Sequence, residues 1–143
     1  MLYKGLRTLG LELVPFDLED VKKELIEILH VHADSLRKLC LGRNRITVEF
    51  LQHLCANLHG CFNQLELIDL THLKEANKIN WVALLQALAT LREEKRKVPL
   101  RVHISDYQTQ KPRKAIFEYL ETSKPNLEIH FNVRKSDEQN KDA

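Results

Sequence analysis

Asp69, His103 and His130 are the residues of this chain whose side-chain types could do chemistry together. One carboxylate and two imidazoles suit a divalent metal such as zinc. Alternatively, the carboxylate could orient His103 as a general base. Each of the three lies between two apolar residues, a pattern typical of a half-buried strand. Whether they meet therefore depends on how the strands that carry them are ordered in a sheet.

The clearest strand signal lies at residues 36–46, which read Leu-Arg-Lys-Leu-Cys-Leu-Gly-Arg-Asn-Arg-Ile. Alternation predicts that Leu39 and Leu41 share the buried face of a short strand, with Leu36 closing the same side. Asn44 is placed to turn the chain out of that strand. The pattern L-x-x-L-x-L-x-x-N-x-I is typical of one leucine-rich repeat, a unit that buries its apolar face only against neighbouring repeats.

Weaker copies of the strand pattern occur at residues 6–11, 65–70, 102–104 and 129–131. The first strand positions, at residues 6, 36, 65, 99 and 126, are roughly 30 residues apart, near the upper end for leucine-rich repeats. The third interval is the longest, and its extra residues are expected within 71–80 or 92–99. Between the strands, apolar residues recur at helical spacing. The expected helix starts are Asp17, Thr47, Asn80 and a position near Pro112.

Strands that alternate with helices predict an α/β fold with a parallel sheet. Two architectures share this order, a doubly wound sheet and an open solenoid. Strands of a doubly wound sheet are apolar on both faces, whereas the positions between the apolar residues are polar here, as at Lys38, Asp69 and His103. The sequence thus favours a leucine-rich-repeat solenoid, an open horseshoe arc of about five β-α repeats with a concave parallel sheet and convex helices. This domain is expected over residues 1–133, with a disordered polar tail at 134–143.

The repeat pattern continues beyond its strand, because residues 50–58 add an apolar helix stripe in the expected place. Residues 36–59 together resemble the ribonuclease-inhibitor type of leucine-rich repeat. The resemblance implies protein recognition by the concave sheet. It weakens in the neighbouring repeats, where Val14 and Leu73 take the place of Asn44, so a continuous asparagine ladder is not expected.

Equivalent positions on adjacent parallel strands form rows across the sheet. The central predicted row is Gly10, Cys40, Asp69, His103 and His130. The row before it is Thr8, Lys38, Leu67, Arg101 and Glu128, and the row after it is Glu12, Gly42, Thr71, Ser105 and Asn132. Asp69, His103 and His130 are therefore expected side by side. Ordinary exposed polar residues of a binding surface nevertheless explain them better than a metal site or a catalytic base does, and no metal or cofactor is expected.

The leading hypothesis is a non-enzymatic interaction module that binds another protein through the concave sheet face. The predicted partner-binding residues are Arg37, Lys38, Cys40, Arg43, Glu66, Asp69, Thr71, Arg101, His103, Glu128 and His130. One alternative is a small metal-dependent or hydrolytic enzyme centred on Asp69, His103 and His130. Another is a structural subunit of a larger complex.

Composition narrows the setting of the protein. The chain has 143 residues and a net charge of +2, which gives no general attraction for nucleic acid. The basic stretches 92–97 and 111–114 are interpreted as solvated helix ends. The three cysteines form no metal-binding pair, which suggests reduced thiols in the cytoplasm or nucleus. No signal peptide is recognised near the start, and no apolar run approaches the roughly 18 residues that span a membrane.

The N-terminal end of the predicted sheet is its weakest boundary. Only residues 1–5 precede the strand expected over Leu6–Leu13, which is too few to build a covering helix. Apolar surface and an unpaired strand edge are expected there. A partner, a second copy or further upstream chain would cover them, and weak self-association through this end is expected.

Overall fold

The computed structural model describes residues 5–92 and 98–133, which form a five-stranded sheet and four α-helices. The strands are β1 (Thr8–Gly10), β2 (Lys38–Cys40), β3 (Leu67–Leu70), β4 (Leu100–Ser105) and β5 (Leu127–Asn132). They lie in the order β1-β2-β3-β4-β5, and all neighbouring pairs are parallel. The predicted α/β class and parallel sheet are confirmed. The tail expected at 134–143 lies outside the described residues.

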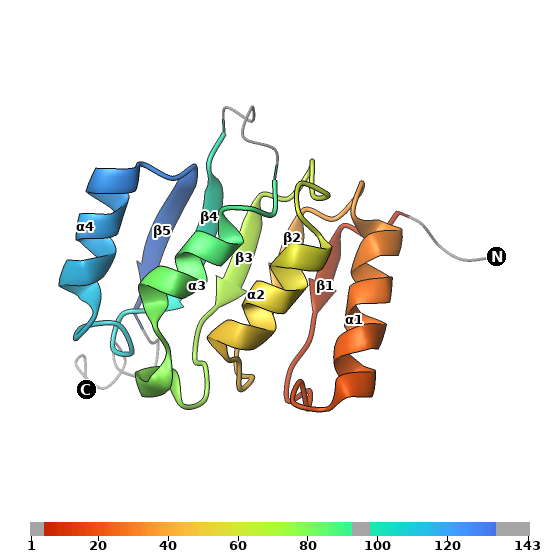
Figure 1. Ribbon diagram of the computed structural model, residues 1–143, viewed down its shortest axis with the longest axis horizontal. Helices are drawn as coiled ribbons and strands as arrows, with labels where there is room; N and C mark the ends of the chain where they lie inside the picture. Colours follow the sequence, from red (N-terminus) through yellow and green to blue (C-terminus); the bar gives the residue numbers. More distant parts are fainter. Residues whose placement is uncertain (1–4, 93–97, 134–143) are drawn as a thin grey trace, which may run out of the picture.

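The helices form a single layer against this sheet. They are α1 (Glu19–His32), α2 (Val48–Asn57), α3 (Trp81–Leu88) and α4 (Arg113–Ser123), with a short 3-10 helix, η1 (Ala76–Lys78), before α3. Figure 1 shows all four α-helices on the same face of the sheet. A doubly wound sheet carries helices on both faces, so the described part of the chain does not have that arrangement. We call the sheet face away from the helices the open face.

The longest spacing between predicted first strand positions, from residue 65 to residue 99, contains an additional short element. The 3-10 helix η1 lies within 71–80, one of the two stretches where extra residues were expected. Part of the other stretch, residues 93–97, lies outside the described residues. None of the described helices combines the length and apolar character needed to cross a bilayer.

Helix starts follow the sequence at three of the four expected positions, since α4 begins directly after Pro112 and two other helices begin after the expected cap residues. Thr47 caps α2 by accepting a hydrogen bond from Phe50 N at 3.1 Å, and Asn80 caps α3 through Ala83 N at 3.2 Å. These side chains satisfy backbone N–H groups that have no partner inside the helix. The prediction for α1 was wrong by one residue, because Leu18 rather than Asp17 is the N-cap and makes no side-chain capping bond.

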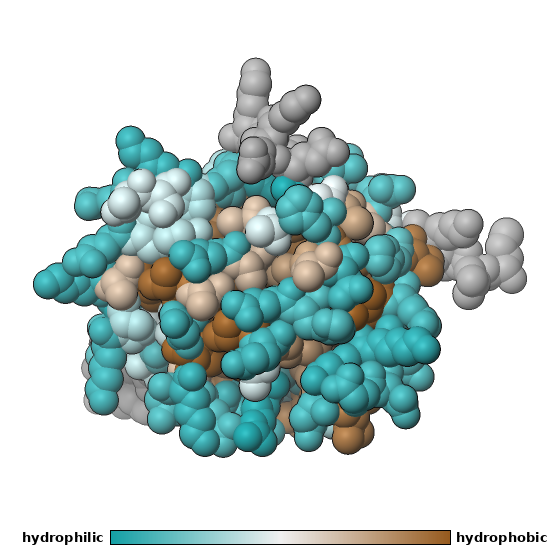
Figure 2. Space-filling model, in the orientation of Figure 1, coloured by the Kyte–Doolittle hydropathy of each residue, from teal (hydrophilic) through white to brown (hydrophobic). Residues whose placement is uncertain are grey.

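The core lies between the sheet and the helix layer. Leu39 and Leu41 are each 1% exposed, which confirms the predicted alternation in β2. Trp81 is 2% exposed at the start of α3 and anchors that helix against the sheet, as its apolar stripe predicted. Figure 2 shows the outer side of the helix layer, where apolar residues are visible between polar side chains.

The α1 end of the molecule departs from the expected burial. Leu18 and Ile28 belong to the apolar residues that recur at helical spacing after Asp17 and are expected to face the core, but both are exposed, as is Val31. Figure 1 shows α1 at one end of the helix layer, with α2 on one side only. An end helix has a neighbour on a single flank, so its apolar stripe is covered on that flank alone.

Three turns repeat the same backbone conformation. Leu13, Arg43 and His72 each lie two residues beyond a core position at a strand end, and their φ angles are 58°, 63° and 57°. These are left-handed conformations, which are unfavourable for most residues other than glycine and asparagine. Repetition of this turn at equivalent positions was not visible in the residue types.

Asn44 joins the turn of its own repeat to the turn before it. Its Nδ2 donates to Leu11 O at 2.7 Å, Leu41 O at 3.0 Å and Gly42 O at 3.2 Å. Its Oδ1 accepts from Val14 N at 2.7 Å. The side chain is 1% exposed, so these bonds are made in the interior.

Gln108 makes a related connection further along the chain. Its Oε1 accepts from Leu73 N at 3.1 Å, and its Nε2 donates to Leu73 O at 2.7 Å. Beside it, the buried Ser105 accepts a hydrogen bond from His72 N at 2.8 Å through its hydroxyl. The turn after β3 is therefore held by residues at the end of β4 and in the loop that follows it, although Leu73 occupies the place of an asparagine.

Candidate functional site

The central row predicted on the sheet is present in the structure. Strand register pairs Gly10 with Cys40, Cys40 with Asp69, Asp69 with His103, and His103 with His130. All five have the phase opposite to the buried leucines, isoleucines and valine of their strands, so they lie on the open face. The alternation that predicted the row is local, which is why the sequence was sufficient to place it.

Asp69 is held by its own strand end. Its Oδ1 accepts hydrogen bonds from Thr71 N at 2.9 Å and from Thr71 Oγ1 at 2.7 Å. No hydrogen bond joins Asp69 to His103 within the described residues. The carboxylate therefore fixes the turn after β3 rather than orienting His103 as a base.

His103 and His130 stack loosely at the β4–β5 side of the row. Their ring centroids are 5.1 Å apart with an interplanar angle of 35°. His130 Nε2 lies 2.6 Å from Glu128 Oε1, and Asn132 Nδ2 lies 3.3 Å from His103 Nδ1.

His103 favours its neutral form. Burial lowers the pKa of His103, and the charge of His130 lowers it further, while Asp69 acts in the opposite direction. Its Nε2 is buried and has no hydrogen-bond partner among the described residues.

Cys40 is poorly suited to nucleophilic chemistry. Burial raises the pKa of its thiol, and the neighbouring charge of Asp69 raises it further. The thiolate is the reactive form of cysteine, so Cys40 is a thiol under ordinary conditions. Burial also raises the pKa of Cys55 in the core, to about 12. All three cysteines are free thiols.

Beside the central row lies a row that carries charge. Register aligns Thr8, Lys38, Leu67, Arg101 and Glu128. Leu67 is only 8% exposed although it lies on the open face, between the two cations of the row. The aliphatic stems of lysine and arginine cover apolar surface while their charged ends stay in water. Lys38 and Arg101 therefore present two positive charges over an apolar base.

A shallow hollow of about 340 Å³ lies at the β1–β3 end of the open face. Gly10, Cys40 and Gly42 form its small-residue floor, and Glu12 and Arg43 flank it with an ion pair of 3.6 Å. A Cβ on Gly42 would come within 2.6 Å of Thr71 O, so β2 and β3 end in close contact that requires glycine. The hollow gives this face a shape as well as a charge pattern.

Arg37 and Glu66 differ from the other predicted site residues. Each immediately precedes a strand. By alternation each is directed away from the open face, because the next residue, Lys38 or Leu67, lies on that face. The register-equivalent residue of β4, Leu100, is buried on the helix side. Arg37 and Glu66 therefore belong to the amino-terminal edge of the sheet. The remaining predicted residues are brought together on the open face: Lys38, Cys40, Arg43, Asp69, Thr71, Arg101, His103, Glu128 and His130.

The row lacks the geometry of a metal centre. Within residues 5–92 and 98–133, no group of three or more His, Cys, Asp or Glu side chains is arranged to hold a metal ion. Asp69 is directed to Thr71, and His130 to Glu128. What the face offers is a set of fixed hydrogen-bonding groups with charges on its flanks.

Sequence reasoning missed two arginines that hold the fold near this site. Arg92 was interpreted as part of a solvated helix end, but it is 5% exposed, and its guanidinium donates to Leu65 O at 3.1 Å and Val98 O at 2.7 Å. Arg113 was interpreted in the same way, but it bonds Asp106 Oδ1 at 2.7 Å and lies 4.1 Å from the ring centroid of Phe131. In a stretch of consecutive basic residues, no regular spacing indicates which side chain is buried.

Comparison of the chain with protein-family models and with curated proteins gives no match.

Proposed function

We propose that this protein is a leucine-rich-repeat solenoid of ribonuclease-inhibitor-like type that binds another protein through the open face of its sheet. The observation that carries the proposal is a parallel sheet with its helices on one side and a polar, charged row on the other. A sheet face of this kind is a broad surface on rigid strands, which suits recognition of another folded surface. The role is non-enzymatic and needs no cofactor.

The chemistry of the face favours binding over catalysis. The pKa of Cys40 is raised, so this thiol is a weak nucleophile, and Asp69 is engaged with Thr71 rather than with His103. The alternative of a hydrolytic or metal-dependent enzyme centred on Asp69, His103 and His130 therefore has less support. A structural role within a larger complex would use the same face and remains the nearest alternative. Free thiols favour the cytoplasm or nucleus as the location.

The partner that fits this face carries mixed charge. Lys38 and Arg101 present positive charge beside the central row, whereas Glu128 and Glu12 present negative charge at its two ends. Complementary charges steer association and select partners more than they add affinity. Nucleic acid is a poor fit, because the charge of the face is balanced rather than uniformly basic.

Site-specific photo-crosslinking tests which face is used. A benzophenone amino acid replaces Arg101 on the open face in one variant and the exposed Gln86 on α3 in another, and each is irradiated in cell extract. The expected result is a discrete crosslinked protein from position 101 and none from position 86. Purified partner should then bind the Arg101→Glu variant roughly tenfold more weakly, with little change in melting temperature. Crosslinking from position 86 in preference to 101 would place the interface on the helices.

A second contact is proposed at the α1 end. Leu18, Ile28 and Val31 are exposed on α1, and among the described strands β1 pairs only with β2. We propose that a second copy covers this end weakly, as the sequence suggested. Sedimentation velocity over a concentration series should show reversible association that Ile28→Lys suppresses. A strict monomer at high concentration would contradict this contact while leaving the open face untouched.

A further inference from the structure

A cleft of about 860 Å³ lies between the loop that follows β3 and the loop that follows β4. Its walls include Leu73, Ile79, Trp81, Tyr107, Lys111 and Pro112. This volume falls in the range of sites that hold small molecules or short peptide segments. The cleft opens at the carboxyl edge of the sheet, outside the row of residues on the open face.

Trp81 gives this cleft an unsatisfied hydrogen-bond donor. The side chain forms part of the wall and is 2% exposed, and its Nε1 is buried with no partner among the described residues. An indole nitrogen can only donate. A buried donor without a partner is unfavourable by the desolvation of that group. Because this nitrogen is closed to solvent, a bound molecule with an acceptor would satisfy it only if side chains of the wall move aside on binding.

Two polar residues of the wall, Gln108 and Tyr107, already have internal partners. Both ends of the Gln108 amide bond the backbone of Leu73. Tyr107 Oη lies 3.1 Å from His72 Nδ1. The partly buried Ile79 and Pro112 add apolar surface. The cleft therefore combines a frame of internal hydrogen bonds, an apolar wall and a buried donor without a partner.

The charge around the cleft favours an anionic ligand. Helix α4 begins directly after Lys111 and Pro112, has no acidic residue in its first turn and has no side-chain cap. Lys111 and Lys114 thus lie near the positive end of the helix dipole, where a negative charge is expected instead. The one carboxylate of the wall, Glu75, is already paired with Arg45 at 2.7 Å and Lys78 at 3.4 Å.

We propose that this cleft binds an acidic peptide segment of a partner protein. A carboxylate side chain lies at Lys111 and the start of α4, an apolar side chain packs on Ile79 and Pro112, and a peptide carbonyl accepts from Trp81 Nε1. A bare inorganic anion would use the charged end alone and leave the apolar wall and the indole unused. This proposal does not rest on the open face, which lies on strands rather than on these loops.

Pools of labelled hexapeptides test the proposal with the full chain. In the acidic pool two positions are glutamate and four are varied, and matched pools carry glutamine or lysine at the two fixed positions. Fluorescence anisotropy measures binding, and emission from Trp81, the single tryptophan of the chain, reports on the site itself. The acidic pool is expected to bind and to shift the tryptophan emission. The glutamine pool should bind at least about tenfold more weakly.

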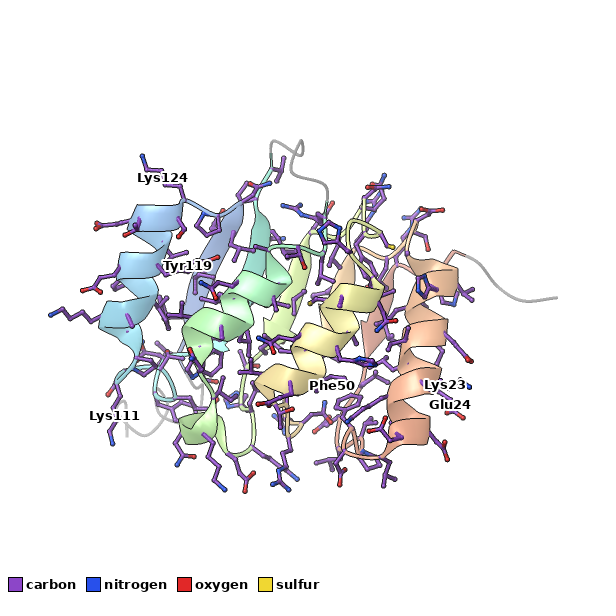
Figure 3. All side chains as sticks on the ribbon, in the orientation of Figure 1. Lys23, Glu24, Phe50, Lys111, Tyr119 and Lys124 are labelled. Carbon is purple, nitrogen blue, oxygen red and sulfur yellow. The ribbon has the colours of Figure 1, made fainter. Side chains whose placement is uncertain are left out.

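Two variants and one matched control locate the binding. Lys111→Glu should weaken the acidic pool by about tenfold or more, and Trp81→Phe, which keeps an aromatic ring but removes the N–H, by about three- to tenfold. Lys23→Glu makes the same charge change on α1, at the opposite end of the molecule from Lys111 (Figure 3), and should stay within about twofold. Circular dichroism checks each fold, and if Trp81→Phe unfolds, the decision rests on Lys111→Glu.

Several results would overturn the assignment. Absence of binding by the acidic pool at millimolar concentration would remove the site. Equal binding of the acidic and glutamine pools would exclude an anionic ligand, and equal loss in Lys23→Glu and Lys111→Glu would show attraction by overall charge. Displacement of the peptides by acetate or phosphate at peptide-like concentrations would mean that a small anion, rather than a peptide, is recognised. Loss of crosslinking from the open face would not affect any of these readouts.

Discussion

The turn after β1 and the turn after β3 are held in related ways by different residues. In the first, Asn44 accepts from Val14 N, and in the second, Gln108 accepts from Leu73 N. Val14 and Leu73 both lie three residues beyond a core position at a strand end. The environments differ, however, because Asn44 is buried and makes four bonds, whereas Gln108 is half-buried and makes two.

This comparison separates a chemical role from a sequence position. What each turn requires is an amide group that supplies an acceptor and a donor to backbone atoms one repeat earlier. Asparagine supplies it from the motif position, and glutamine, with one more methylene, supplies it from one residue further along. The absence of asparagine at Leu73 therefore does not leave the turn unsupported.

Removal of Asn44 is expected to have the largest effect. Asn44→Ala leaves Val14 N, Leu11 O and two further carbonyls without their partner in the interior. Net bonds of about 1 kcal/mol each, together with unpaired buried groups, predict a loss of about 3–5 kcal/mol. Urea unfolding measures it, and Asn57→Ala, which removes an exposed bond on α2, is the control expected to stay below about 0.5 kcal/mol. Equal losses would show that Asn44 is not an interior tie.

Removal of Gln108 should be felt less. Gln108→Ala breaks two bonds at a half-buried site, where water can reach part of the freed backbone. A loss of about 1–2 kcal/mol is expected in the same urea experiment. Gln86→Ala, on the exposed side of α3, is the matched control with a loss below about 0.5 kcal/mol. A loss of unfolding free energy as large as that of Asn44→Ala would mean that burial does not explain the difference between the Asn44 and Gln108 hydrogen bonds.

The backbone of the same two turns offers a change of opposite sign. Leu13 is 66% exposed at a φ of 58°, so its side chain gains little from packing while its backbone is strained. Leu13→Asn should raise the free energy of unfolding by about 0.5–1 kcal/mol, because asparagine tolerates the left-handed region. His72→Asn should give no gain, since it also removes the contact with Tyr107 Oη at 3.1 Å. Equal gains at both sites would show that the contact is unimportant.

The smallest expected effect depends on pH and concerns His103 in the central row. The pKa of His103 is lowered in the folded state, so the unfolded chain binds its proton more tightly. Stability from this group is therefore complete above the unfolded pKa of about 6.5 and is lost as the pH falls through that value toward the lower folded pKa. Between pH 7.5 and 5, wild type should lose more stability in urea than His103→Gln. An equal or greater loss in the variant would contradict burial of His103 as the cause.

Local patterns predicted the register and three of the four helix starts. Leu39 and Leu41 set the phase of β2, and Thr47 and Asn80 cap the helices that directly follow them, so both inferences needed only neighbouring residues. The same alternation would have excluded Arg37 and Glu66 from the open face. Each lies one position before a residue of that face, and neighbouring strand residues point to opposite faces. Asp17 failed by one residue because a cap depends on backbone geometry as well as residue type.

The contacts that were missed span the chain. Gln108 reaches Leu73, 35 residues earlier, and Arg92 reaches Leu65, 27 residues earlier. The spacing of apolar residues predicts neither contact. Each contact depends on the space left between the turns after the strands have paired. The cleft beside Trp81 is likewise formed by two loops whose distance apart follows from strand order. Such features require the assembled sheet.

The order β1-β2-β3-β4-β5 has a mechanical consequence. In the described sheet each strand bonds only to the strands next to it in the chain, so force applied between the two ends of the sheet loads one junction after another rather than all at once. Extension should then separate the molecule in steps of about one strand and its helix, starting at the weaker end. The short β1 and its half-covered helix α1 make the amino-terminal end the expected first step. A surface held by a partner across several strands would bridge those junctions and make the same molecule resist extension as a single unit.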